Sequence, residues 1–353
     1  MKPSLFATDP KTLAAWLESV GEKPYRAKQI LDWIYQKKQL KLEQMTNLNA
    51  SVKAKLQEKF SFSSVEVVKQ ELSQDQETIK FLFRLPDGKL IESVLIMSDK
   101  RRTVCVSSQV GCPAKCAFCA SGQKGWMRNL DAGEIIAQVL EIDAYLSTQA
   151  ERVSHIVYMG MGEPLENYDA VVESIRLLCH PEMLNLSQRR ITVSTVGVIE
   201  GILKLAKEAF KVNLVLSLHA PNQKIRKKII PYARQYALEE ILEAMDHYSL
   251  ESKRDITYEY ILISGINDQK EHAEELAVLL RGKQCAVNLI PYNPIPNLRL
   301  KRPDHETIKT FRSTLSAKGL VHTCRYTKGD DIAAACGQLA LQEETESPLK
   351  MIS

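Results

Sequence analysis

The chain has 353 residues, of which 44% are hydrophobic and 25% are charged, and its net charge is only +4. These values are typical of a globular protein with a sizeable core, and they exclude a low-complexity chain. No apolar run approaches the ~20 residues needed to cross a bilayer. Pro3, Asp9 and Lys11 interrupt the N-terminus, where a secretory signal would be apolar. We therefore expect a cytoplasmic protein with no membrane partner.

Positive charge is concentrated at the start of the chain. Residues 1–70 hold 12 Lys or Arg and 7 Asp or Glu, which leaves the rest of the chain close to neutral. Such a basic segment either contacts an anionic partner, of which RNA is one candidate, or is a solvated helix face. Between residues 9 and 60 the apolar residues recur at steps of three and four, which predicts short helices. We expect a helical, basic accessory domain over residues 1–64.

Residues 65–97 change to the alternating pattern of β-strands. Two alternating runs flank Pro86, Asp87 and Gly88, a sequence that is typical of a tight turn. We expect this segment to be a β-hairpin that links two domains.

From residue 98 onward, strand patterns alternate with helix patterns. Strands are expected at residues 102–107, 154–159, 190–194, 212–217, 256–263, 286–290 and 321–326. Helices are expected at residues 131–147, 169–179, 199–209, 237–249, 271–281 and 305–317, the first with Asp131 and Glu134 spaced as a capping box. This alternation implies a parallel sheet with right-handed crossovers. About six βα units favour a complete or partial barrel, which we expect to span residues 98–342 before a flexible tail at 343–353.

Three cysteines follow the first expected strand of this core. Cys112, Cys116 and Cys119 lie in the sequence Cys-Pro-Ala-Lys-Cys-Ala-Phe-Cys. A structural zinc site would take a fourth ligand, usually from a second Cys-x-x-Cys pair, and the sequence has no such second pair. Three thiolates on a four-iron cluster leave one iron free to bind a substrate. This spacing is typical of radical S-adenosylmethionine (SAM) enzymes, so we expect one [4Fe–4S] cluster, with zinc and buried thiols as the alternatives.

Polar residues at the ends of expected strands form a second pattern. Residues 158–164 hold Gly160, Gly162 and Glu163, which allow close backbone approach and can accept hydrogen bonds from an ammonium group. Four further polar residues follow other strands: Ser194, Ser217, His219 and Asn293. Because ligand sites gather at the carboxyl ends of barrel strands, we expect these residues to face one mouth. A plain strand-end loop, and a structural role for His219, are the alternatives.

Several sequence blocks together resemble the RlmN/Cfr family of radical-SAM RNA methyltransferases over nearly the whole chain. The blocks are residues 21–26, 104–112, 159–164, 217–221, 288–294, 329–332 and 335–339. The resemblance implies an α/β fold: a partial (β/α)6-type radical-SAM barrel with a small helical N-terminal accessory domain and a β-hairpin linker. It implies methylation of a ring carbon of adenosine in 23S ribosomal RNA and also in transfer RNA, next to the anticodon. It further implies a flavodoxin-like electron donor, a thiol reductant and a monomeric enzyme.

The resemblance also implies roles for individual residues. It assigns Cys112, Cys116 and Cys119 to the cluster, and it assigns to SAM the residues Gly162, Glu163, Ser194, Ser217, Leu218, His219 and Asn293. It makes Cys336 the methyl-carrying residue, Cys105 its resolving partner and Glu92 a proton acceptor. By residue type alone, Cys105 and Cys336 would be structural thiols, as would Cys179, Cys285 and Cys324.

The mechanism that the resemblance implies uses two SAM molecules per turnover. One SAM methylates Cys336, and a second yields a 5′-deoxyadenosyl radical that takes a hydrogen from that methyl group. The resulting carbon radical adds to adenine, and release leaves a Cys105–Cys336 disulfide, which is ordinary thiol chemistry. We therefore expect Cys105 and Cys336 to be neighbours.

The resemblance leaves the methylated carbon open between C2 and C8. Pro164 and the sequence at residues 328–331 favour C2, because the Cfr type has alanine at the position of Pro164. The alternatives are Cfr-type C8 methylation of 23S ribosomal RNA, a radical-SAM enzyme that acts on a non-RNA substrate, and a non-enzymatic iron–sulfur protein that binds RNA. Basic residues at 100–102, 188–190 and 224–228 are expected to contact phosphates.

Overall fold

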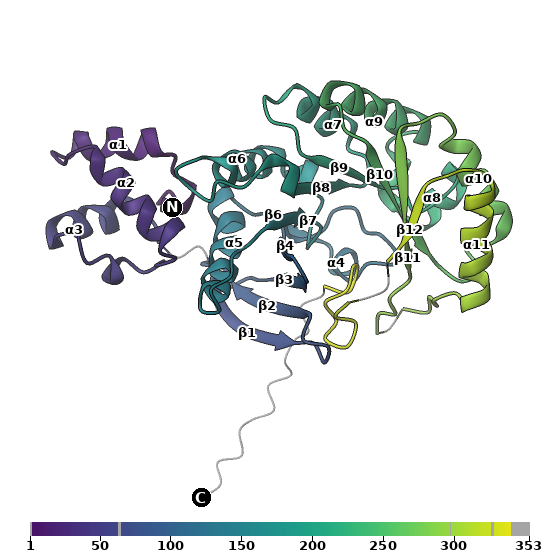
Figure 1. Cartoon of the computed structure of the whole chain (residues 1–353), viewed down its shortest axis with the longest axis horizontal. Helices are drawn as coiled ribbons and strands as arrows, with labels where there is room; N and C mark the ends of the chain where they lie inside the picture. The colour runs from purple at the N-terminus through teal and green to yellow at the C-terminus, as the bar shows by residue number, and fades with distance from the viewer. Residues whose placement is uncertain (1, 63–64, 297, 326–327, 340–353) are drawn as a thin grey trace, which may run out of the picture.

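The computed structural model describes residues 2–62, 65–296, 298–325 and 328–339. It consists of a helical N-terminal domain and a larger α/β core (Figure 1). The N-terminal domain contains α1 (Pro10–Ser19), α2 (Tyr25–Leu31) and α3 (Ala50–Lys59). Side chains cap two of these helices: Asp9 accepts a 3.0 Å bond from the Thr12 amide, and Asn49 accepts a 2.9 Å bond from the Val52 amide.

The core is built on one ten-stranded sheet whose first part is antiparallel. Strands β1 (Glu66–Leu72), β2 (Thr78–Arg84) and β3 (Leu90–Ser98) pair in sequence, and β3 pairs antiparallel with β4 (Arg101–Cys105). Strands β2 and β3 form the expected hairpin, and Pro86, Asp87 and Gly88 lie in the turn between them. Through the β3–β4 pairing, these strands continue the sheet of the core.

The second part of the sheet is parallel. It runs from β4 through β7 (His155–Tyr158), β8 (Ile191–Thr195), β9 (Asn213–Ser217), β10 (Ile256–Leu262), β11 (Cys285–Pro291) and β12 (His322–Cys324). Helices connect these strands and lie outside the curved sheet (Figure 1): α5 (Ala132–Ser147), α6 (Tyr168–Cys179), α7 (Ile199–Lys207), α9 (Leu238–Ser252), α10 (Lys270–Leu279) and α11 (His305–Ala317). In the described ranges no pairing joins β1 to β12, so the barrel is partial. The predicted fold class is confirmed.

The helix α5 begins where the sequence predicts. The Glu134 amide donates to Asp131 Oδ1 at 2.8 Å, and the Asp131 amide donates to Glu134 Oε2 at 3.0 Å, which is the expected capping box. The N-terminal domain packs against this part of the core. Lys38 forms an ion pair with Asp143, a fully buried residue of α5, and Gln36 Nε2 donates to the Met183 carbonyl at 3.1 Å.

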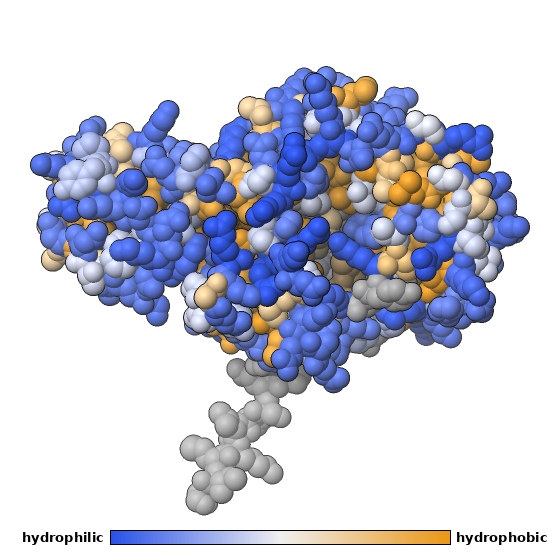
Figure 2. Space-filling model, viewed as in Figure 1, coloured by the Kyte–Doolittle hydropathy of each residue, from blue (hydrophilic) through white to orange (hydrophobic). Residues whose placement is uncertain are grey.

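Several short elements were not expected from the sequence. Besides β1 they include β5 (Gln109–Gly111), β6 (Trp126–Asn129), α4 (Ala120–Gln123) and α8 (Gln223–Ile229). Each has at most seven residues, too few for a hydrophobic period to identify. The face in Figure 2 is largely hydrophilic. Across the described ranges, no helix is both long and apolar enough to span a membrane.

Candidate functional site

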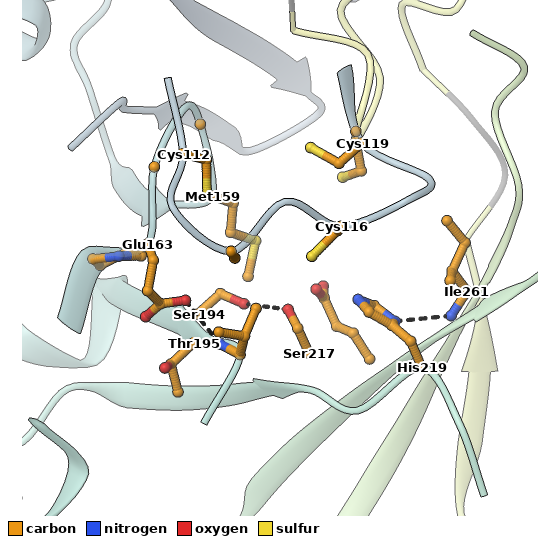
Figure 3. A pocket seen from close by; sticks show the side chains of 18 of the residues that line it. Cys112, Cys116, Cys119, Met159, Glu163, Ser194, Thr195, Ser217, His219 and Ile261 are labelled. Carbon is orange, nitrogen blue, oxygen red and sulfur yellow. Dashed lines mark hydrogen bonds between the residues drawn. The ribbon is translucent and has the colours of Figure 1, made fainter. Parts of the chain in front are cut away.

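A cavity opens at the carboxyl ends of the parallel strands, inside the curve of the sheet. Its volume is about 780 Å³, including its open mouth. Residues from distant parts of the chain line it: Cys112, Cys116, Cys119, Glu163, Ser194, Ser217, His219 and Cys336. Figure 3 shows most of these side chains pointing toward one another across the cavity. The structure therefore brings the cysteine triplet to the mouth where the polar strand-end residues meet.

The cysteine loop is held in place by its own backbone and by close glycine packing. The Cys112 amide donates to the Gly125 carbonyl at 3.0 Å, and the Ala117 amide donates to the Ile229 carbonyl at 2.8 Å. Gly111 has φ +76°, and a Cβ there would lie 1.8 Å from the Gly125 carbonyl oxygen. Only glycine therefore allows the β5–β6 hairpin to close beneath the loop.

The three thiols suit a cluster better than a single ion. Within the described ranges, no three His, Cys, Asp or Glu side chains converge on a position for one metal ion. A tetrahedral zinc needs such convergence, whereas a four-iron cluster takes each thiolate on a different iron. Burial raises the pKa of Cys112 to about 12 and also raises the pKa of Cys116 and of Cys119. Three thiolates here would need nearby positive charge, which an iron cluster supplies.

Glu163 presents a buried carboxylate to the cavity. Its amide donates to Gln109 Oε1 at 2.8 Å, and its carboxylate accepts bonds from the amides of Leu165 (3.1 Å) and Val196 (2.8 Å). The preceding Gly162 has φ +111°, and a Cβ there would lie 2.8 Å from Gln109 Cβ. Burial raises the pKa of Glu163 to about 7. A cationic ligand in the cavity would favour the ionised carboxylate.

Ser194, Ser217 and His219 also line the cavity, and Ser194 lies next to Glu163 (Figure 3). The hydroxyl oxygens of Ser194 and Ser217 lie 3.2 Å apart. His219 Nδ1 accepts a 3.0 Å bond from the Ile261 amide, and burial lowers the pKa of His219 to about 3. The imidazole is therefore neutral, with its proton on Nε2 available as a donor. Leu218 is fully buried and its side chain does not line the cavity, so only its backbone could meet a ligand there.

A second cavity of about 1170 Å³, including its mouth, adjoins the first. Cys336 and Gly337 line both cavities, and Cys105 lines the second. The structure thus places Cys105 and Cys336 around one space, as the expected disulfide requires. Burial raises the pKa of both thiols, although Cys336 is exposed to the cavity itself.

The Cys336 segment is docked onto the helix that follows the cysteine loop. The Ala120 amide donates to the Gly337 carbonyl at 2.7 Å, and Ser121 Oγ donates to the Leu339 carbonyl at 2.6 Å. Asn293 lines the second cavity rather than the first, and its Nδ2 donates to the Cys336 carbonyl at 3.2 Å. Asn293 therefore contacts the methyl-carrying candidate at the boundary between the two cavities, and its expected contact with SAM stays a prediction.

Glu92 lines neither of these two cavities. It is buried on β3, where Lys80 Nζ lies 3.4 Å from Glu92 Oε1 and 2.9 Å from Glu71 Oε2. Burial raises the pKa of Glu92, and Lys80 opposes that rise. Because side chains alternate along a strand, Glu92 shares a sheet face with Val94, which does line the second cavity.

Two site residues depart from the sequence analysis. Glu259, not singled out there, lines the first cavity and is in register with Ser217 and Asn288 on the neighbouring strands. The sequence feature that could have identified Glu259 is a lone carboxylate in a strand that is otherwise largely apolar. Arg226 was expected to contact phosphates as part of residues 224–228, but it is fully buried, so that expectation is wrong for Arg226. Its position on α8 turns it toward the core.

Comparisons with known proteins agree with this geometry. Residues 106–277 match the Radical SAM superfamily, and residues 4–61 match the ribosomal RNA large subunit methyltransferase N-terminal domain. The "Probable dual-specificity RNA methyltransferase RlmN 2" of Protochlamydia amoebophila is 66% identical over 98% of this chain and 96% of its own length. The corresponding Lysinibacillus sphaericus protein is 45% identical over 98% of this chain and 91% of its own. A crystal structure of a radical SAM methyltransferase from Sphaerobacter thermophilus superposes with a TM-score of 0.93 at 44% identity, covering 96% of this chain and 99% of that one.

Proposed function

This chain belongs to the RlmN family of RNA methyltransferases, and on that premise we propose that it methylates carbon 2 of an adenosine in 23S ribosomal RNA and in transfer RNA. The observation that carries the proposal is the position of Cys336. This residue lies on the shared wall of two cavities, with the cysteine triplet on one side and Cys105 on the other. A methyl carrier needs this placement, because it must meet the methyl donor first and the RNA base afterwards.

The first cavity is the proposed site of the cofactors. Cys112, Cys116 and Cys119 would hold one [4Fe–4S] cluster. SAM would be contacted by the residues expected from the sequence: Gly162, Glu163, Ser194, Ser217, Leu218 through its backbone, His219 and Asn293. When bound, the cluster and two SAM molecules per turnover supply a methyl group and one-electron chemistry. Glu163 and the neutral His219 supply an acceptor and a donor for the charged and polar groups of such a ligand.

The two cysteines of the second cavity would carry the methyl group and release the product. Cys336 would lose its proton and take the methyl group from the sulfonium of SAM, whose sulfur–methyl bond breaks and which leaves as S-adenosylhomocysteine. Once this carbon, less one hydrogen atom, has been joined to adenine and the ring proton has been lost, the Cys105 thiolate would attack the Cys336 sulfur. The carbon–sulfur bond then breaks, the carbon takes up a proton, and the products are a Cys105–Cys336 disulfide and the methylated base. Glu92 is the proposed acceptor of the proton that the base loses. An external thiol reductant then restores both thiols.

The surroundings of the second cavity support an RNA substrate. Arg101, Arg325 and Lys328 line it, and its described lining contains no Asp or Glu. Such a basic opening suits a phosphate backbone and a base that has been turned out of its stack. We propose that residues 1–64 form an accessory domain that adds phosphate contacts, residues 65–97 join it to the core, and residues 98–342 form the catalytic core. We also place the enzyme in the cytoplasm, as a monomer that receives electrons from a flavodoxin-like donor.

The proposal is tested with anaerobically reconstituted protein, SAM, a reductant and separate 23S ribosomal RNA and transfer RNA transcripts. Mass spectrometry of the digested RNA should find 2-methyladenosine in both. Finding 8-methyladenosine would assign the Cfr-type reaction instead. RNA that remains unmethylated while SAM is consumed would point to another substrate class and overturn the proposal.

A further inference from the structure

Arg226 places a fully buried guanidinium beside the cysteine loop. It lies on α8 and is 0% exposed, whereas its neighbours Lys227 and Lys228 are exposed. A buried charge is costly unless hydrogen bonds and an opposite charge compensate it. Hydrogen bonds and an opposite charge in the site must therefore offset the free-energy cost of burying this guanidinium.

Backbone carbonyls satisfy only part of the guanidinium. Arg226 Nη2 donates to the carbonyls of Val196 (2.5 Å) and Ser217 (3.3 Å), and Nε donates to the Leu218 carbonyl (3.2 Å). These carbonyls lie in the segments at the ends of β8 and β9 that also carry Ser194 and His219. Arg226 thus fixes two walls of the first cavity relative to each other.

Among the residues that the structure describes, one buried nitrogen of the guanidinium has no hydrogen-bond partner and no carboxylate pairs with it. In the described ranges, Nη1 is buried and makes no hydrogen bond, and Arg226 forms no ion pair of 4 Å or less. Burial lowers the pKa of Arg226 to about 10, and the nearby Cys116 and Glu163 oppose that fall. Its helix is also tied to the cysteine loop, because the Ala117 amide donates to the Ile229 carbonyl at 2.8 Å.

We propose that Arg226 is a positioning residue that compensates the negative charge of the three cysteinates and their cluster, and thereby favours the reduced cluster. This inference rests on the proposed function, which puts an anionic iron–sulfur centre in the first cavity. Adding an electron to a buried anionic centre is less costly when a cation lies nearby in a medium of low dielectric constant.

The experiment separates the charge of Arg226 from its hydrogen bonds. Arg226→Lys keeps a charge and a donor, whereas Arg226→Gln keeps a donor and removes the charge. Lys227→Gln removes an exposed charge from the same helix and is the matched control. Each protein is reconstituted anaerobically, its iron and sulfide per chain are measured, and its cluster is titrated against potential by electron paramagnetic resonance without SAM or RNA.

We expect wild type, Arg226→Lys and Lys227→Gln to load similar amounts of iron and to have clusters with the same reduction potential. In Arg226→Gln the ratio of reduced to oxidised cluster at a fixed potential should fall about tenfold, equivalent to about 59 mV for one electron, or the cluster should fail to load. Thermal unfolding of the cluster-free proteins shows whether each variant is folded.

Three results overturn the inference. In the first, the cluster of Arg226→Gln has the same reduction potential as that of wild type. In the second, the reduction potential shifts equally in Arg226→Lys and Arg226→Gln. In the third, both variants lose the same amount of folded cluster-free protein. If wild type itself loads no four-iron cluster, the proposed function fails; if wild type loads one and only the variants disagree, the function stands and this inference alone fails.

Discussion

Asn293 donates a hydrogen bond from its side-chain amide to the carbonyl oxygen of Cys336, with 3.2 Å between the two atoms. The Asn293 carbonyl oxygen in turn accepts a 3.0 Å bond from Arg302 Nη2. The family resemblance assigns Asn293 to SAM, and in the structure its side chain also holds the segment that carries Cys336. The residue therefore links the position of Cys336 to the loop that follows β11.

Replacing Asn293 should loosen the Cys336 segment. Such a hydrogen bond contributes about 1 kcal/mol, so in Asn293→Ala the cluster-free protein should be alkylated at Cys336 about fivefold faster than wild type. Mass spectrometry of iodoacetamide-treated protein measures the rate. Cys285, which lines neither cavity, is the internal control. An unchanged Cys336 rate would show that Asn293 does not hold the segment.

Removing the proposed resolving thiol should trap the product on the protein. In Cys105→Ala nothing attacks the Cys336 sulfur, so a covalent protein–RNA adduct should accumulate and be visible on a denaturing gel. Cys336→Ala should bind cluster and SAM but transfer no methyl group, and the double variant should form no adduct. If Cys105→Ala turns over normally and stays free of RNA, the resolving role is wrong.

The glycine beneath the cysteine loop should be indispensable for cluster loading. In Gly111→Ala the new Cβ meets the Gly125 carbonyl at 1.8 Å, which must displace the β5–β6 hairpin at a cost of about 3 kcal/mol or more. Iron per chain should fall by most of its wild-type value. Gly88→Ala is the matched control, because Gly88 also has a positive φ but nothing lies within 4 Å of its Cβ position. Full loading of Gly111→Ala would contradict this account.

The Lys80–Glu92 pair should make stability depend on pH. Burial raises the pKa of Glu92, so the folded protein loses stability as pH rises from the ordinary carboxyl pKa through the folded value, and Lys80 limits that loss. Lys80→Met should therefore cost little at about pH 4 and about 3 kcal/mol at about pH 8 in urea unfolding. Glu92→Gln should remove part of the added pH dependence of Lys80→Met, and the remainder comes from Glu71, whose carboxylate lies 2.9 Å from Lys80 Nζ and whose pKa Lys80 lowers. An equal cost at both pH values would show that the pair carries no such coupling.

The residues that could be identified from the sequence are those whose signal is local. The spacing of Cys112, Cys116 and Cys119, the alternation of strands and helices from residue 98, and the capping box at Asp131 each need only a few neighbouring residues. The short elements β5, β6, α4 and α8 were missed because periodicity needs more residues than they contain. The burial of Arg226 was missed because the run of basic residues around it is typical of a solvated face.

The sequence by itself determined the fold class, the cysteine triplet and the family, because strand alternation and motif spacing are properties of the chain. Only the tertiary structure decided that Asn293 holds Cys336 and that Arg226 on α8 is buried. It also placed Cys105 and Cys336, 231 positions apart along the sequence, on one cavity, as the family resemblance implied. The physical reason is that these relationships depend on how loops at the ends of different strands pack together. No local pattern of residues specifies that packing.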